Sequence, residues 1–307
     1  MTGDRSAPGG SSTSRPKPSR SSSRSVEASS TSGSPGSGAL RALADLHRIS
    51  PARSLGQHFL TDPNLAKAIA RDAGVGPGDR VVEIGAGLGS LTVALADTGA
   101  ARVLAIEFDR ALLPALRAVV ADRPSVEVLA ADATKMAWPA VLGGGAWVCC
   151  GNLPYNVGTA IVLDVLEHAP MVERLVVTVQ REVADRFAAA PGARDYGPTS
   201  IRIAYGATVE VVRAVPREVF WPRPSVASSV VRITRLEHPA VDVGEERLWR
   251  VVDEAFAQRR KTIRAAVRRL GVEDPEALLE TAHVRAGARP EELALGEFAR
   301  IAEALPA

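Results

Sequence analysis

The sequence has few of the residues on which several common classes of protein depend. Only 4% of its 307 residues are aromatic, and it contains 2 cysteines and 5 histidines. Cys149 and Cys150 are adjacent, which suits neither a disulfide framework nor a metal site, and the histidines do not have the spacing of metal ligands. We therefore expect no bound metal and a reducing, cytoplasmic environment.

The chain also lacks a long uninterrupted hydrophobic run and a strong net charge. The longest stretch without a charged residue, 136–163, is interrupted by Pro139, by the glycines at 143–145 and by Pro154, so it cannot form one membrane-spanning helix. The formal net charge is +2, which by itself does not indicate a nucleic-acid partner. The distribution of the charges is therefore more informative than their sum.

The first 38 residues consist mainly of Ser, Gly, Pro and Arg and contain almost no large apolar side chain. Such a segment cannot bury enough surface to offset its ordering entropy, so we predict a disordered tail over 1–38. It lacks the apolar core of a secretory signal, and its Gly and Pro content argues against the amphipathic helix of a mitochondrial transit peptide. Its small positive excess fits a solubilising tail or a loose contact with RNA.

Four predicted strands end in residues that can bind a nucleoside. In an open α/β sheet, ligands bind at the carboxyl ends of the strands, so these ends should meet at one site. Glu107 follows a glycine-rich turn by roughly 20 residues, which is where a ribose-binding carboxylate belongs. Asp132 can accept a hydrogen bond from an adenine amine or cap a turn. The strands and the residues that follow them are 80–84 with Gly85, 102–106 with Glu107, 126–130 with Asp132, and 146–151 with Asn152.

The glycine-rich turn at 85–89, with the sequence GAGLG, precedes a helix that we predict over 90–97. Glycines let the backbone approach a ligand closely, and the amino terminus of a helix favours polar or anionic groups. The dinucleotide fingerprint requires glycine at its sixth position, where this chain has Ser90. The turn therefore fits a nucleoside ligand that has no pyrophosphate.

The motif Asn152-Leu153-Pro154-Tyr155 follows the fourth strand and offers groups that can hold a flipped-out base. The Asn152 side chain and the carbonyl of Pro154 can accept hydrogen bonds from an exocyclic amine, and Tyr155 can stack on the ring. Pro154 has a fixed φ angle, so these acceptors are held without an ordering cost at binding. On pattern alone, an ordinary turn accounts for the same residues equally well.

Two other segments suggest contacts with a ligand or with RNA. The segment 54–60 (SLGQHFL) precedes a helix predicted over 63–73, and it either covers a ligand or serves as a packed connector. The segment 220–225 (FWPRPS) joins strands predicted over 208–215 and 226–235. Its aromatic and basic groups lie between prolines, so it forms either a platform for RNA or a hairpin that packs on the core.

Strand signals stop at about residue 240, and the apolar residues beyond it recur at helical spacing. We therefore divide the ordered chain into a sheet-containing domain, 39–238, and a small helical domain, 239–307. The stretch 259–269 is strongly basic and contains no acidic residue. Such charges repel one another unless phosphates lie near, which favours contact with RNA over a solvated surface. The basic residues at its start are Arg259, Arg260, Lys261 and Arg264.

Together these motifs resemble the rRNA adenine N6,N6-dimethyltransferase family, and within it the bacterial small-subunit branch of the KsgA/RsmA type. The resemblance covers the chain from about Ile49 onward. Its most specific parts are the pattern FxPxPxVxS at 220–228 and the segment RRKTIR at 259–264, because many methyltransferases share the glycine-rich loop. The family usually has Asn where this chain has His58, but the backbone of His58 and Leu60 can still serve the cofactor.

The resemblance implies a Rossmann-like α/β fold of the S-adenosylmethionine-dependent methyltransferases with a small C-terminal helical domain. The implied reaction is direct transfer of a methyl group from the cofactor's sulfonium to adenine N6, performed twice. The implied substrate is the pair of adjacent adenosines in the 3′-terminal hairpin of 16S rRNA within an immature small subunit, and we expect a monomer. The implied cofactor-binding residues are His58, Leu60, Gly85, Gly87, Glu107, Asp132 and Asn152; the catalytic residues are Asn152, Leu153, Pro154 and Tyr155; and the RNA-binding residues are Arg223, Arg259, Arg260, Lys261 and Arg264.

Three other functions remain open. Macrolide-resistance methyltransferases of large-subunit rRNA share the fold and the first motifs, although the segment 259–264 resembles the small-subunit branch. A ribosome-assembly or transcription factor that keeps the fold without catalysis is the second, and the intact 152–155 motif and Glu107 argue against it. A nicotinamide-dependent dehydrogenase is the third, and Ser90 together with the lack of an evident proton-transfer constellation argues against it.

Overall fold

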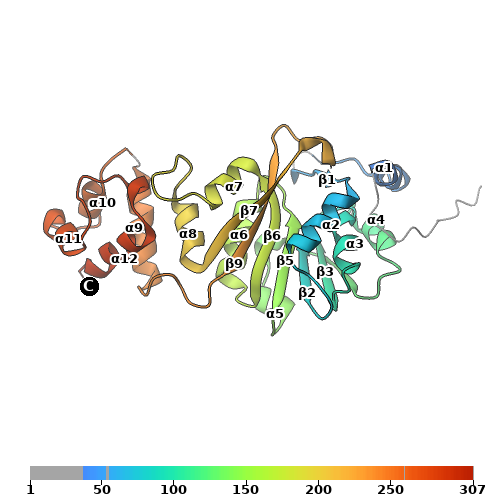
Figure 1. Cartoon of the computed structure of the whole chain (residues 1–307), viewed down its shortest axis with the longest axis horizontal. Helices are drawn as coiled ribbons and strands as arrows, with labels where there is room; N and C mark the ends of the chain where they lie inside the picture. Colours follow the sequence, from blue (N-terminus) through green and yellow to red (C-terminus); the bar gives the residue numbers. More distant parts are fainter. Residues whose placement is uncertain (1–36, 53–54, 259, 307) are drawn as a thin grey trace, which may run out of the picture. The chain divides into compact units, whose positions relative to one another are not determined.

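The structure is a computed structural model that describes residues 37–52, 55–258 and 260–306 (Figure 1). The predicted tail lies outside the described residues except for its last two positions, which begin helix α1 (Ser37–Leu46). Arg259, which we predicted to contact RNA, also lies outside them.

A seven-stranded sheet forms the centre of the fold, with the strand order β4-β3-β2-β5-β6-β9-β7 (Figure 1). The first five of these strands are parallel, and β9 and β7 complete the sheet in antiparallel orientation. The chain proceeds from β2 outward to β3 and β4 and then returns to β5 on the other side of β2. Such a reversal opens a crevice at the carboxyl ends of β2 and β5, where open α/β sheets bind ligands. The strands are β2 (Arg80–Ile84), β3 (Arg102–Glu107), β4 (Val126–Ala130), β5 (Trp147–Asn152), β6 (Val172–Gln180), β7 (Ala207–Val215) and β9 (Ser228–Arg235).

The sheet lies between two layers of helices because its central strands are apolar on both faces. In β2, Val82 and Ile84 pack into a cluster with residues of α5 to α8, whereas Val81 packs on the other face with α2 and α3. The predicted fold class is therefore confirmed. The helices of this part are α2 (Pro63–Asp72), α3 (Ser90–Ala96), α4 (Leu113–Val119), α5 (Trp138–Leu142), α6 (Gly158–His168), α7 (Arg181–Phe187) and α8 (Pro198–Gly206), with the short helices η2 (Ala133–Lys135) and η3 (Arg217–Val219).

A separate two-stranded sheet joins β1 (Phe59–Leu60) to β8 (Phe220–Trp221) in antiparallel orientation. Its pairing is extended by Thr61, whose backbone N–H donates to the carbonyl of Val219 at 2.8 Å. The sequence predicted neither strand, because a run of two residues shows no periodicity and its partner is far away in the chain. The pairing brings together the segments 54–60 and 220–225, each of which we had considered as a ligand contact.

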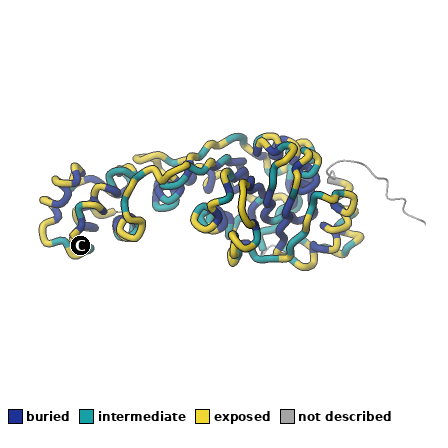
Figure 2. Tube along the Cα trace, turned by 90° about the horizontal axis from the view of Figure 1, so that it is seen from below, coloured by how far each residue is buried: buried dark blue, intermediate teal, exposed yellow. Residues whose placement is uncertain are grey.

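Beyond β9 the described residues form helices and turns, as the spacing of apolar residues predicts. Leu248, Val251 and Val252 lie on the buried face of α9 and have no exposed surface. They share a core with Tyr196, which precedes the helix α8, and with Ile201 in the first turn of that helix. In Figure 2, buried segments alternate with exposed ones along these helices. The elements are α9 (Glu245–Ala257), α10 (Ile263–Arg269), α11 (Pro275–Thr281), η4 (Pro290–Glu292) and α12 (Leu295–Ala304).

Among the helices that the structure describes, none combines the length and the hydropathy that are needed to cross a bilayer.

Candidate functional site

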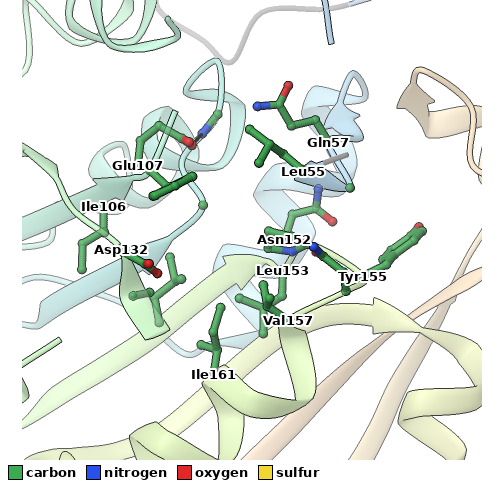
Figure 3. A pocket seen from close by; sticks show the side chains of 18 of the residues that line it. Leu55, Gln57, Ile106, Glu107, Asp132, Asn152, Leu153, Tyr155, Val157 and Ile161 are labelled. Atoms are coloured by element: carbon green, nitrogen blue, oxygen red, sulfur yellow. Dashed lines mark hydrogen bonds between the residues drawn. The ribbon is translucent and has the colours of Figure 1, made fainter. Parts of the chain in front are cut away.

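A cavity of about 280 Å³ lies at the carboxyl ends of β2 to β5. The four residues predicted to mark these strand ends, Gly85, Glu107, Asp132 and Asn152, all line it. Figure 3 shows Glu107 and Asp132 on one side of the cavity and Asn152 and Tyr155 on the other. The expectation that these strand ends form one site is therefore confirmed in the structure.

The glycine-rich turn forms the floor of the site in a conformation that requires glycine. Gly85, Gly87 and Gly89 have φ angles of 76°, 57° and 83°, which side chains rarely adopt. A Cβ atom on Gly87 would also lie 3.1 Å from the Phe59 ring. The turn thus exposes its backbone to the cavity, and the absence of side chains leaves room for the Phe59 ring of β1 to pack against it.

Glu107 connects the end of β3 to the glycine-rich turn through hydrogen bonds of its side chain. Its Oε2 atom accepts from the backbone N–H of Gly87 at 2.8 Å, and its Oε1 atom accepts from the N–H of Asp109 at 2.7 Å. Burial raises the pKa of Glu107 above its ordinary value, and the two N–H donors oppose this shift. Because a carboxylate oxygen can accept more than one hydrogen bond, Glu107 retains acceptor capacity for a ligand hydroxyl.

Asp132 caps a turn, which is one of the two roles predicted for it. Its Oδ1 atom accepts from the Thr134 hydroxyl at 2.7 Å and from the Thr134 N–H at 3.0 Å, at the start of η2. The Thr134 hydroxyl holds the pKa of Asp132 below its usual range. Asp132 is therefore a carboxylate at neutral pH, and it lines the cavity at the same time.

Asn152 presents its amide in a defined orientation at the end of β5. Its Nδ2 group donates to the main-chain carbonyl of His58 at 2.7 Å. Its Oδ1 atom is buried and accepts no hydrogen bond from the described residues. A buried acceptor without a partner is costly, so this oxygen is suited to a donor supplied by a ligand.

The structure corrects the predicted role of the Pro154 carbonyl. This oxygen accepts from the backbone N–H groups of Gly158 at 2.9 Å and of Val157 at 3.2 Å, at the start of α6. Both of its lone pairs are thus engaged within the turn, which the sequence could not indicate. The neighbouring carbonyl of Leu153 accepts none of the hydrogen bonds found among the described residues, and Leu153 lines the cavity.

Tyr155 is held at both ends of its side chain. Its hydroxyl lies 2.7 Å from the Ser228 Oγ atom at the start of β9. Its ring lies 5.1 Å from the His58 ring, centroid to centroid, with an interplanar angle of 33°. Burial raises the pKa of Tyr155 above its ordinary value, so the phenol is neutral at neutral pH.

A second, smaller chamber of about 20 Å³ adjoins the glycine-rich turn and is lined by Leu60, Glu83, Ser90 and Asn152, among others. Glu83 Oε2, Ser90 Oγ and Asn152 Oδ1 are all buried without a partner among the described residues. Burial raises the pKa of Glu83 to about 8. Three unpartnered polar atoms around one chamber fit a small polar ligand group.

The predicted site residues leave out several that line the two cavities, among them Phe108 and Glu83. Phe108 lines the cavity with 58% of its surface exposed, and its position directly after Glu107 could have indicated this. Glu83 is an acid inside a buried strand, which is itself a signal of a functional position.

The four predicted RNA-binding residues that the structure describes do not line the cavity. Arg223 is exposed and pairs with Glu218, and Arg264 is exposed and pairs with Glu276 at 2.7 Å. Arg260 and Lys261 are exposed and form no ion pair with another described residue.

The family model and the sequence relatives indicate one family. Residues 50–306 match the model of the family described as ribosomal RNA adenine dimethylase. The ribosomal RNA small subunit methyltransferase A of Kineococcus radiotolerans is 42% identical over 275 residues, which cover 87% of this chain and 90% of that protein. The crystal structure of the 23S rRNA methyltransferase ErmE is 30% identical, with a TM-score of 0.63, and the match covers 80% of this chain and 99% of that one. A dimethyladenosine transferase from Plasmodium falciparum has a TM-score of 0.69 at 24% identity, over 80% of this chain and 96% of that one.

Proposed function

The chain belongs to the ribosomal RNA adenine dimethylase family, and from this membership we propose that it dimethylates N6 of two adjacent adenosines in the 3′-terminal hairpin of 16S rRNA. The substrate in this proposal is an immature small ribosomal subunit, and the methyl donor is S-adenosylmethionine. The observation that carries the proposal is the cavity in which the nucleoside-binding strand ends meet the 152–155 motif.

The residues around the cavity fit S-adenosylmethionine, which supplies an electrophilic methyl group on a sulfonium when bound. We assign the ribose hydroxyls to Glu107, whose oxygens retain acceptor capacity, and the adenine amine to Asp132. The glycine-rich turn gives the close backbone approach that a nucleoside needs. The unpartnered polar atoms of Glu83 and Ser90 beside the glycine-rich turn suit the charged amino-acid end of the cofactor through a bridging water molecule, because the chamber of about 20 Å³ has room for about one. Leu60 borders that chamber and His58 borders the main cavity.

The 152–155 motif is assigned to the target adenine. The N6 lone pair is delocalised into the ring, so the amine is a poor nucleophile. The Asn152 Oδ1 atom and the Leu153 carbonyl can accept from this amine, draw it toward tetrahedral geometry and stabilise the positive charge that develops during attack. Tyr155 stacks on the base, and Pro154 contributes by holding the turn that begins α6. The N6 proton becomes acidic after attack, so transfer to water completes each round.

We assign contact with the RNA outside the cavity to Arg223 and to the basic residues Arg259, Arg260, Lys261 and Arg264 of the C-terminal helical domain. The support is the absence of acid from 259–269 in the sequence and the exposure of Arg260, Lys261 and Arg264. Phosphates would neutralise this concentration of charge. We place the protein in the cytoplasm, where ribosomal subunits mature, and expect it to act as a monomer.

The sequence identity to the two relatives favours the small ribosomal subunit over the large one as the substrate. The relative named for the small subunit is 42% identical to this chain, whereas the one named for 23S rRNA is 30% identical. The reaction on the large subunit is therefore the second candidate. A non-catalytic assembly factor is the third, and the unpartnered Asn152 Oδ1 atom argues against it, because a purely structural site has no need to leave a buried acceptor open.

Methyl incorporation from labelled S-adenosylmethionine tests the proposal. Purified protein would be incubated separately with immature small subunits and with large-subunit rRNA. We expect label in the small-subunit RNA alone. Label in the large-subunit RNA alone would favour the second candidate, and cofactor binding without label in either RNA would favour an assembly factor.

A further inference from the structure

The side chain of His58 lies where three segments of the site meet. Its Nδ1 atom is 2.6 Å from the carbonyl oxygen of Pro222, and its ring faces that of Tyr155 at 5.1 Å. Its main-chain carbonyl accepts from the Asn152 amide at 2.7 Å. One half-buried residue thus connects the β1 motif, the base-binding motif and the turn after β8.

The contact with Pro222 continues the pairing of β1 with β8. Phe59 pairs with Trp221 and Leu60 with Phe220, and this register places His58 beside Pro222. The imidazole bond to the Pro222 carbonyl thus adds a side-chain contact at the end of this pairing.

The chemistry of the contact fixes the form of the ring. A carbonyl oxygen only accepts hydrogen bonds, so the Nδ1 atom of His58 must carry the hydrogen. The segment from Pro222 to Ser228 is then anchored twice around Tyr155. His58 binds its first residue, and the Tyr155 hydroxyl contacts its last residue at 2.7 Å.

We propose that the His58 side chain is a positioning residue for the target adenosine. It holds the 222–228 segment against Tyr155 and so fixes the ring on which the base stacks. The proposal rests on the proposed function, because it takes Tyr155 as the platform for the target base. The side chain does not act on the cofactor. The Asn152 amide donates to the main-chain carbonyl of His58, an acceptor that is present in each of the variants below.

Three substitutions separate the two contacts of the side chain. His58→Asn places an amide N–H close to the position of Nδ1 and keeps the bond to Pro222 without the ring. His58→Phe keeps a ring beside Tyr155 without the donor, and His58→Ala removes both. His238→Ala is the matched control, since His238 is exposed and lies between β9 and α9, away from the cavity.

The readouts are KM for the RNA, kcat, the affinity for S-adenosylmethionine by calorimetry, and hydrogen exchange of the segments 153–158 and 220–228 in the free protein. We expect His58→Ala to raise KM for the RNA by about tenfold, with cofactor affinity within roughly twofold of wild type. The rate of hydrogen exchange in both segments should rise in His58→Ala and His58→Phe. In His58→Asn, the exchange rate of 220–228 should return to the wild-type value, together with most of the RNA affinity. His238→Ala should match wild type throughout.

Two results would overturn the role of His58. One is an unchanged KM for the RNA in His58→Ala, whether or not hydrogen exchange rises. The other is a loss of cofactor affinity as large as the loss for RNA, which would make His58 a cofactor residue. Failure of the wild-type protein to methylate small-subunit RNA would instead overturn the proposed function itself, and the positioning role with it.

Discussion

At the scale of single residues, three carboxyl groups near the site differ because their surroundings differ. Glu83 is almost fully buried with one oxygen unpartnered, so burial dominates and favours the neutral form. Glu107 is also buried but accepts two backbone N–H bonds, which oppose the effect of burial. Asp132 is more exposed and accepts from Thr134, which favours the anion. Residue type alone therefore did not determine their chemistry.

Glu83 should make the stability of the protein depend on pH. Its pKa is raised from an ordinary 4.5 to about 8, so the folded chain keeps a proton that the unfolded chain loses. The stability that Glu83 contributes is therefore fully present below its ordinary pKa and is lost as the pH rises through about 8. We expect the free energy of unfolding of wild type, relative to Glu83→Gln, to decline between about pH 5 and pH 8. Urea unfolding across this range measures it, and a constant difference between the two proteins would contradict the expectation.

Glu107→Ala should weaken cofactor binding more than it affects folding. The substitution removes the proposed acceptor for the ribose hydroxyls and leaves the N–H groups of Gly87 and Asp109 without their partner. We expect the Kd for S-adenosylmethionine to rise by about 10- to 100-fold, which corresponds to the loss of one or two hydrogen bonds to a charged group. Calorimetry measures this, with Glu127→Ala on the neighbouring strand as the control. An unchanged Kd would remove Glu107 from the cofactor site.

At the scale of elements, the sequence predicted strands of the central sheet from short apolar runs that are bounded by turn residues. The predicted strand 126–130 coincides with β4, and 80–84 coincides with β2. It did not predict β1 or β8, whose formation depends on pairing between distant residues. Likewise, the engagement of the Pro154 carbonyl depends on where α6 begins, and that start carries no polar cap in the sequence. The local sequence pattern thus predicted the strand ends around the cavity, but not the tertiary contacts that orient the residues there.

Gly151 should be essential for the close approach of β5 to β2. A Cβ atom at this position would lie 2.5 Å from the carbonyl oxygen of Ile84, so the two strands would have to separate. We expect Gly151→Ala to reduce the free energy of unfolding by roughly 1–3 kcal/mol. It should also weaken cofactor binding, because Gly85 and Asn152 line the cavity at the ends of these two strands. Gly144→Ala is the control, since a Cβ atom there meets nothing within 4 Å. Equal stability of the two variants in urea would contradict the account of this contact.

At the scale of the whole molecule, the proposed function divides the task of binding RNA between the cavity and the basic residues around the start of α10. The net charge of +2 is small, so affinity for phosphates has to come from a local concentration of charge. Arg260 and Lys261 provide exposed cations without an ion pair to another described residue, whereas Arg264 is partly neutralised by Glu276. The sequence located these residues, but the pairing of Arg264 depends on α11 and could not be predicted from it.

The double substitution Arg260→Ala with Lys261→Ala should raise KM for the RNA and leave the Kd for S-adenosylmethionine unchanged. We expect the slope of log affinity against log salt to decrease by about 1 to 2, because up to two phosphate contacts are lost. Arg102→Ala is the control, since Arg102 begins β3, at the end of the sheet opposite the cavity. An unchanged salt slope would show that these residues do not contact phosphate.

The most direct test of the central claim is nucleoside analysis of 16S rRNA from cells that lack their own adenine dimethyltransferase and express either this protein or its Asn152→Ala variant. The account predicts N6,N6-dimethyladenosine with the wild-type protein and little or none with the variant, since the proposed acceptor for the target amine is removed. Normal dimethyladenosine in the variant would contradict the role assigned to the 152–155 motif, and its absence with the wild-type protein would contradict the proposed function.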